Sequence, residues 1–209
     1  MLREQRRRLS ERKDVQSVIT VYLVEDDKDF CLLIQRTIEK AEDMEFLGCT
    51  NHPETALEQV EELKPDVVLV DLCLDGESLE GIETARKIRL SSDAKVLILT
   101  GYEDMNTVSE ACFRSFASEY IFKKDFLYLT DRIRASATGI TSSEILIFSL
   151  IVNRLTPSEK SQLYKILGKD IQLMSSPKTQ ANQKSQLLKR LGLSDSREII
   201  HLFKNIPIS

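Results

Sequence analysis

Apolar and polar positions follow two distinct rhythms along residues 18–138. Continuous apolar, β-branched runs predict buried strands, whereas apolar residues three and four positions apart predict helices with one buried face. The runs predict five strands, at residues 18–24, 45–49, 66–71, 95–100 and 120–122. The helical spacing predicts five helices, at residues 28–41, 53–63, 79–89, 104–116 and about 125–138. Strands that alternate with helices in this way predict an α/β fold with one doubly wound, five-stranded parallel sheet.

The pattern changes after residue 139, where no further strand is predicted. Residues 140–154 carry an apolar helical stripe, and three start signals follow: Thr156–Pro157 with a capping box to Glu159, Ser176–Pro177, and Ser194. The chain therefore divides into four segments. We predict a basic arm at 1–17, an α/β domain at 18–138, a helical linker at 139–154 and a small all-α domain at 155–209.

Charge divides the chain along nearly the same boundaries. The 209 residues carry a formal net charge of −4, made up of +3 in residues 1–17, −12 in residues 18–154 and +5 in residues 155–209. A basic C-terminal quarter joined to an acidic body is typical of a segment that faces nucleic acid. A solvated basic helix face would give the same count, so charge alone leaves both interpretations open.

Several classes of protein and site are disfavoured. The longest apolar run, Ile145–Val152, is far shorter than the roughly 20 residues of a membrane span. No apolar stretch follows the N-terminal charges, so we expect no signal peptide, no membrane partner and a cytoplasmic location. Two histidines, His52 and His201, argue against a histidine metal cage or a Ser-His-Asp triad, and the lack of G-x-G excludes a dinucleotide fingerprint and a P-loop.

The cysteines show no C-x-x-C spacing. In a cytoplasmic chain this pattern predicts free thiols rather than disulfides or a zinc site. The four expected free thiols are Cys31, Cys49, Cys73 and Cys112.

Acidic, hydroxyl and basic residues stand at the ends of the predicted strands. Glu25 and Asp26 follow the first strand, Asp71 ends the third, Thr100 ends the fourth and Lys123 follows the fifth. Parallel α/β sheets bind ligands at the carboxyl ends of their strands, so we expect these side chains to share one crevice. Carboxylates gathered in a crevice invite a hard cation, and Mg²⁺ is the natural choice for oxygen ligands.

An aspartate in such a crevice can attack a phosphoryl group and form an acyl phosphate. The metal would offset the developing charge, and a hydroxyl and an ammonium group would hold the phosphoryl oxygens. Haloacid-dehalogenase chemistry also uses a strand-end aspartate, but that family resembles D-x-D, whereas three residues separate Asp71 from Asp75 here. Taken singly, Asp71 could be an ordinary strand-end acid and Thr100 a helix N-cap.

Four segments together resemble the receiver domain of bacterial response regulators. They are VYLVEDDKDF, PDVVLVDLCL, KVLILTG and YIFKK, in the order and spacing of that family. The resemblance covers about residues 18–138 and implies a flavodoxin-like fold, with a histidine kinase as partner and Asp71 as the phosphorylated residue. The other implied roles are metal ligation by Asp26, Asp71 and the Cys73 backbone carbonyl, indirect metal contact by Glu25, phosphoryl contact by Lys123, and switching by Thr100 and Tyr120.

Three positions depart from the receiver pattern. Asp75 stands where proline is usual, Lys124 replaces the proline that usually follows Lys123, and Glu119 replaces a common glycine. These changes leave the expected chemistry intact and bear on loop geometry. Tyr120 also has a second interpretation, as an ordinary core aromatic.

The C-terminal domain partly resembles the LuxR-type helix-turn-helix. LTPSEKSQLYKILG matches its first helix, and SPKTQANQKSQLLKRLGLSDSREIIHLF matches its recognition helix, turn and last helix. The chain is about six residues short where that family has a scaffold helix, and polar Gln180 and Lys184 replace apolar residues that would face it. The resemblance implies that the following residues face DNA: Lys178, Asn182, Gln183, Ser185, Gln186 and Lys189.

We therefore expect a response regulator that accepts phosphate on Asp71 and regulates transcription, without enzymatic turnover of its own. Phosphorylation would favour a homodimer. The alternative is a receiver whose degenerate output domain binds protein or self-associates without DNA. In the last helix, Ile199, Ile200 and Phe203 would form either core or a dimer face.

Overall fold

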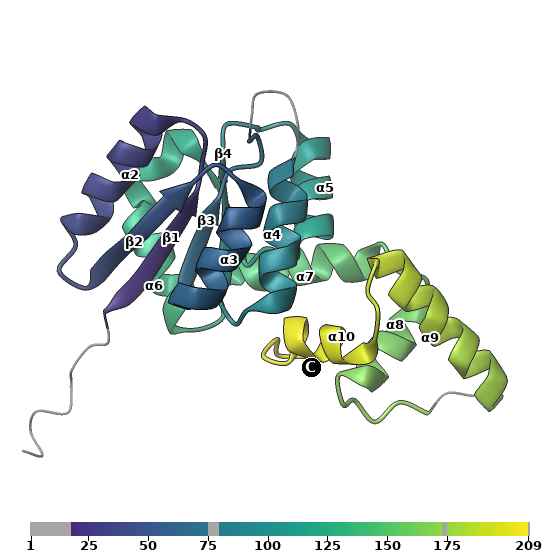
Figure 1. Cartoon of the computed structure of the whole chain (residues 1–209). Helices are drawn as coiled ribbons and strands as arrows, with labels where there is room; N and C mark the ends of the chain where they lie inside the picture. Colours follow the sequence, from purple (N-terminus) through teal and green to yellow (C-terminus); the bar gives the residue numbers. More distant parts are fainter. Residues whose placement is uncertain (1–17, 75–79, 173–174, 209) are drawn as a thin grey trace, which may run out of the picture.

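A computed structural model of the chain describes residues 18–74, 80–172 and 175–208. The basic arm at 1–17 and Asp75 lie outside the described residues. Two bodies are visible, an α/β domain and a smaller helical one, joined through helix α7 (Figure 1). The domain boundaries themselves stay a prediction.

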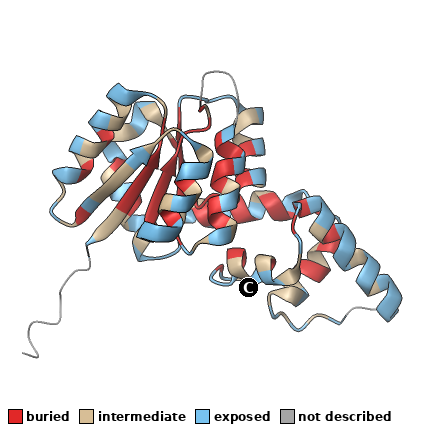
Figure 2. Ribbon diagram, viewed as in Figure 1, coloured by how far each residue is buried: buried red, intermediate tan, exposed pale blue. Residues whose placement is uncertain are grey.

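The α/β domain is built on a parallel sheet in the order β2-β1-β3-β4-β5. This order is the flavodoxin-like one, and the expected fold class is confirmed. Apolar side chains alternate onto both faces, so the central strands are buried except at their first residues (Figure 2). The strands are β1 Ile19–Val24, β2 Met44–Thr50, β3 Val67–Val70, β4 Lys95–Thr100 and β5 Glu119–Phe122.

Helices cover both faces of the sheet. One apolar cluster joins β1, β3 and β4 to α2 and α6, and a second joins the opposite face of the strands to α3, α4 and α5. The helix predicted from about residue 125 differs in its first turn, where a 3₁₀ helix holds Asp125 in a non-helical conformation. The bounds are α2 Lys28–Glu39, α3 Pro53–Leu63, α4 Glu80–Ser91, α5 Met105–Ser115, η1 Lys123–Tyr128 and α6 Leu129–Thr138.

The C-terminal region is helical, and its helices begin at or near the start signals that the sequence predicts. Thr156 and Glu159 form the expected capping box, and Ser176 caps the next long helix. The last start signal is displaced by one residue, because Asp195 rather than Ser194 accepts the first backbone N–H groups. The helices are α7 Ser142–Asn153, α8 Pro157–Ile166, α9 Pro177–Leu191 and α10 Ser196–Phe203. No helix separates α8 from α9 in the described residues.

The helical body packs directly against the receiver-like body. A single apolar cluster contains Cys112 of α5 and Phe116, the residue that follows α5. Side chains of α7, α8, α9 and α10 complete the same cluster. Phe203 of α10 meets the Phe116 ring at a centroid distance of 5.8 Å and the Phe148 ring of α7 at 5.1 Å. Ile199 belongs to this core as well, whereas Ile200 is 44% exposed.

The cysteines differ from the expectation. Cys31 and Cys49 form a disulfide, so the prediction of four free thiols is wrong for this pair, while Cys73 and Cys112 are free. The start of α2 and the end of β2 flank the same end of β1, which brings the two Cα atoms to 6.8 Å. That separation is at the upper end of what a disulfide spans.

Within the described segments, no single helix is long and apolar enough to cross a membrane. Residues Lys123–Thr138 and Ser142–Asn153 pass the length and composition test only as a pair, bent by 71°.

Candidate functional site: an acid pocket at the strand ends

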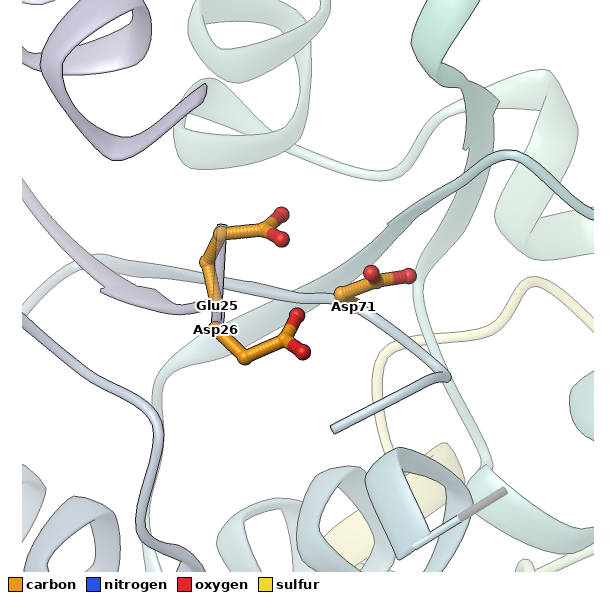
Figure 3. Close-up of side chains that lie close together, drawn as sticks. All are labelled: Glu25, Asp26 and Asp71. Carbon is orange, nitrogen blue, oxygen red and sulfur yellow. The ribbon is translucent and has the colours of Figure 1, made fainter. Parts of the chain in front are cut away.

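Two neighbouring strands bring three carboxylates together. β1 and β3 are parallel and paired, so Glu25 and Asp26 leave one strand beside the point where Asp71 leaves the other. One carboxylate oxygen of each lies within 4.8 Å of the others. Figure 3 shows the three side chains close together, with those of Glu25 and Asp26 extending toward the side on which Asp71 lies. The sequence correctly predicted that these acids meet.

Lys123 closes the pocket from the end of β5. Its Nζ lies 2.9 Å from Asp71 Oδ2 and 2.8 Å from Glu25 Oε2, and it sits over the Phe30 ring at 4.5 Å. Burial opposes the charge on Lys123, but the hydrogen bonds to Asp71 and Glu25 outweigh burial and raise the Lys123 pKa. The lysine is therefore a fixed positive charge between two carboxylates.

Burial in the pocket changes the acidity of Glu25. Glu25 is 2% exposed and Asp71 is 5% exposed. Burial raises the pKa of Glu25 to about 7, helped by the nearby Asp71 charge and opposed by the hydrogen bond from Lys123. A carboxylate with such a pKa gains from a further cation beside it.

Asp71 keeps one carboxylate oxygen uncommitted. Its backbone N–H is bonded to the Val24 carbonyl at 2.9 Å, which fixes the residue at the end of the strand. Oδ2 is bonded to Lys123, whereas Oδ1 is buried and has no hydrogen-bond partner among the described residues. A buried, unpartnered carboxylate oxygen facing two other carboxylates fits a divalent cation with oxygen ligands, as Mg²⁺ is.

Thr100 and Tyr120 lie on the two adjacent strands. Thr100 is fully buried at the end of β4, and its hydroxyl accepts a hydrogen bond from the Tyr102 backbone at 3.4 Å. The Tyr120 hydroxyl donates to the Tyr102 carbonyl at 3.0 Å, and burial raises the Tyr120 pKa. The Tyr120 ring packs on the apolar cluster under α4 and on the cluster shared with the C-terminal helices. It is thus partly a core aromatic, with its hydroxyl tied to the loop after Thr100.

Cys73 follows the strand end and is partly buried. Its backbone carbonyl remains a predicted metal ligand. Asp71, Asp26 and Lys123 otherwise form a set that can hold a cation and present a carboxylate oxygen beside a fixed ammonium group. That combination is suited to accepting an anionic, electrophilic group such as a phosphoryl group.

The residues expected to face DNA lie on α9, far from the acid pocket. Five of them are exposed, and Gln183 differs because it is half-buried and its side-chain oxygen accepts from Gln162 of α8 at 3.2 Å. The Lys165 ammonium group of α8 donates to the Gln180 side-chain oxygen at 3.4 Å, so polar side chains form part of the contact between the two helices. The exposed five are Lys178, Asn182, Ser185, Gln186 and Lys189.

The sequence pattern does not indicate several buried charges outside the acid pocket. Glu119, the residue that replaces a common glycine, is 1% exposed and binds Arg132 and Ser143 at 2.8 and 2.7 Å. Glu144 of α7 is bonded to Lys95 at 2.8 Å and lies 3.9 Å from Arg89. The sequence does carry a signal that Arg89 is buried, because Arg89 follows Ile82 by seven residues and therefore lies on the apolar face of α4.

Solved structures and curated proteins resemble this chain. A two-component response regulator of the LuxR family from Aurantimonas is 28% identical, with a TM-score of 0.54 over 66% of this chain and 97% of that one. RcsB of Salmonella enterica serovar Typhimurium, bound to the rprA promoter, shares the fold at 18% identity, with a TM-score of 0.52 over 88% of this chain and 98% of that one.

Among curated proteins, the transcriptional regulatory protein LiaR of Bacillus subtilis is 27% identical over 147 residues, or 70% of this chain and 69% of LiaR. Residues 21–134 match the family model of the response regulator receiver domain. Since this match covers more than half of the chain and includes every member of the acid pocket, the protein belongs to the response regulators of two-component signalling.

Proposed function

We propose that the protein is a phosphorylation-switched regulator that accepts a phosphoryl group on Asp71. The observation that carries this proposal is the buried, unpartnered Oδ1 of Asp71, held beside Lys123 and two further carboxylates. An ordinary strand-end aspartate would face solvent or would have both oxygens bonded. The relatives named above include transcriptional and response regulators, which supports the same activity here.

In the proposed step, an Asp71 carboxylate oxygen attacks the phosphorus of a phosphohistidine on the kinase. The new O–P bond forms as the P–N bond breaks, and the imidazole leaves with the electron pair of that bond. Asp26, Asp71 and the Cys73 carbonyl would hold Mg²⁺, which supplies charge neutralisation for the transferring group. Lys123 holds a phosphoryl oxygen, and the Thr100 hydroxyl turns toward another.

Incubation of the full chain with acetyl phosphate and Mg²⁺, followed by intact mass measurement, tests this proposal. We expect one phosphoryl group per chain, none with Asp71→Ala, and none when EDTA replaces Mg²⁺. Asp66→Asn is the matched control, because Asp66 lies at the opposite end of β3 and binds Thr20 instead. Phosphoryl mass that persists in Asp71→Ala would reject the assignment.

We propose further that α9 contacts DNA. The support is its outward row of exposed polar and basic side chains, including Lys178 and Lys189, within a region of net charge +5. Lysines would lie on phosphates, while Asn182 and Gln186 would reach base edges. The absence of a helix between α8 and α9 in the described residues favours the second candidate, a protein-binding or self-associating output domain.

An unbiased selection of DNA duplexes by the full chain, with and without beryllofluoride as a phosphoryl mimic, separates the two candidates. DNA binding predicts an enriched sequence whose retention falls steeply with salt. Absent or salt-insensitive retention, together with a beryllofluoride-dependent increase in mass by light scattering, would favour self-association. A homodimer that also retains DNA is the outcome expected of a phosphorylated transcription regulator.

A further inference from the structure

Two cysteines meet at the corner of the α/β domain where Glu25 and Asp26 leave β1. Cys31 lies in the first turn of α2, and Cys49 lies one residue before the end of β2, the edge strand that pairs with β1. Figure 1 shows α2 beside the β2 edge of the sheet. The disulfide between the two residues therefore joins a helix to a strand across 18 positions of the chain.

Small molecules in solution can reach this pair of cysteines. Cys49 is exposed and Cys31 is partly buried. Exposed disulfides exchange with thiols in solution, whereas buried structural disulfides resist reduction. Cys112 shows the opposite environment, because it is buried among apolar side chains and burial raises the pKa of its thiol to about 11. The Cys112 thiol therefore stays protonated and unreactive, while the Cys31–Cys49 pair is open to exchange.

Both sulfur atoms lie against the backbone of Glu25. The Glu25 carbonyl oxygen is 3.8 Å from Cys31 Sγ and 3.9 Å from Cys49 Sγ. The Glu25 N–H donates to the Thr50 carbonyl at 2.9 Å, and the Cys31 N–H donates to the Asp27 carbonyl at 2.8 Å. The chain from Glu25 to Asp27 is thus bonded to the end of β2 on one side and to the start of α2 on the other.

We propose that Cys31 and Cys49 are a reversible thiol–disulfide site, with small-molecule thiols and disulfides as its co-reactants, and that its oxidation state sets how firmly the segment carrying Glu25 and Asp26 is held. A thiol S–H is a weak donor that can reach the Glu25 carbonyl at these distances, whereas a disulfide has no S–H to donate. Oxidation therefore replaces weak hydrogen bonds by a covalent link between α2 and β2. The site is independent of the proposed phosphorylation of Asp71.

Oxidation proceeds in two exchange steps. The thiolate of the exposed Cys49 attacks one sulfur of the small-molecule disulfide, so that a new S–S bond forms as the old one breaks and the first small thiolate leaves. The Cys31 thiolate then attacks the Cys49 sulfur of this mixed disulfide, and the second small thiolate leaves. The two protein thiols lose two electrons and two protons, which the two small thiols carry away. Reduction by excess small thiol follows the same steps in reverse.

The test equilibrates the full-length wild type, Cys49→Ser and Cys112→Ala with mixtures of reduced and oxidised glutathione. After acid quenching, alkylation of the unfolded protein and intact mass measurement count the free thiols. We expect the oxidised wild type to lose two alkylated thiols, with peptide mapping that joins Cys31 to Cys49, and excess reduced glutathione to restore both. Cys112→Ala should show the same change, whereas Cys49→Ser should form no internal disulfide.

Hydrogen–deuterium exchange of the same samples tests the hold on the acidic segment. Amides of residues 25–31 should exchange at least about tenfold more slowly in the disulfide form, because a cross-link over 18 positions restricts the opened state. Amides of α10 should exchange equally in both forms.

Three results would overturn the proposal. Cys31 and Cys49 could stay reduced at every glutathione ratio, or their disulfide could resist every ratio, and either result would reject a reversible site. Equal exchange of residues 25–31 in both forms would reject the hold on the acidic segment. If Cys49→Ser does not fold, Cys31→Ala should likewise form no internal disulfide and should abolish the redox dependence of exchange.

Discussion

Helix α4 meets the C-terminal helices at a contact that we call the α4 junction, formed by Arg86, Arg89, Lys95 and Glu144. The acid pocket and the α4 junction both bury charged groups, but they differ in how completely those charges are balanced. In the pocket, Glu25 and Asp71 share Lys123, and Asp71 Oδ1 has no hydrogen-bond partner within the described residues. At the junction, Glu144 is shared by Lys95 and Arg89, and Arg89 also meets backbone carbonyls. Buried negative charge without enough counter-charge favours the binding of a cationic ligand. Buried charges that neutralise one another instead stabilise the packing of the elements that carry them.

The largest effect is expected from removing a carboxylate in the pocket. Asp71→Asn should abolish phosphoryl incorporation, because the amide is not a nucleophile toward phosphorus. The same substitution removes one of three repelling charges, so the free energy of unfolding should stay constant or rise. Intact mass after incubation with acetyl phosphate measures phosphoryl incorporation. Urea unfolding of the same preparation measures the free energy of unfolding. A marked loss of stability would contradict the proposed excess of negative charge.

Removing a carboxylate at the α4 junction should lower the free energy of unfolding and leave phosphoryl incorporation unchanged. Glu144→Gln leaves Arg89 and Lys95 without their shared counter-ion, and we expect a loss of about 3 kcal/mol in the free energy of unfolding. Phosphoryl incorporation at Asp71 should persist, because Glu144 lies outside the pocket. Urea unfolding measures the first quantity and intact mass the second. A loss below about 1 kcal/mol would show that the junction is not a stabilising charge cluster.

A smaller effect is expected where the two regions meet. Tyr120→Phe removes the hydrogen bond to the Tyr102 carbonyl but keeps the ring in both apolar clusters. The free energy of unfolding should fall by about 1 kcal/mol, the usual net contribution of one such bond. Urea unfolding again provides the measurement. A loss as large as that of Glu144→Gln would mean that the hydroxyl, not the ring, organises this part of the structure.

The smallest effect is expected on the exposed face of α9. If Lys178 lies on a phosphate, Lys178→Ala should weaken DNA binding evenly across sequences and lower the salt slope of log K by about one. Fluorescence anisotropy at several salt concentrations measures the slope, with Lys87→Ala as a charge-matched control. An unchanged slope would remove Lys178 from the proposed interface.

The sequence predicts the pocket well because strand ends fix it. Apolar runs define where β1, β3, β4 and β5 stop, and a parallel sheet then places Glu25, Asp71 and Lys123 at one edge without further information. The placement of side chains at such an edge follows from their position along a strand, whereas their roles are implied by the receiver resemblance. This is why the acids, Thr100 and Lys123 could be named before their distances were known.

The junction depends on tertiary packing, and the sequence predicts it poorly. Arg86 acts through backbone carbonyls of residues more than one hundred positions away, and backbone acceptors leave no trace in residue type. The sequence does not predict the Cys31–Cys49 disulfide for a related reason, because its geometry depends on how α2 and β2 flank β1. The resemblance to the LuxR-type recognition helix implies that Gln183 faces DNA, but it does not show that Gln183 contacts Gln162 of α8.

Chemical trapping of the phosphorylated residue tests the central claim most directly. Borohydride reduces an aspartyl phosphate to homoserine, and tandem mass spectrometry of the treated full chain then locates the converted residue. Phosphoryl transfer to the pocket predicts homoserine at Asp71 alone, dependent on Mg²⁺ and on the phosphodonor. Homoserine at any other aspartate, or none in protein that carries the phosphoryl mass, would contradict the account.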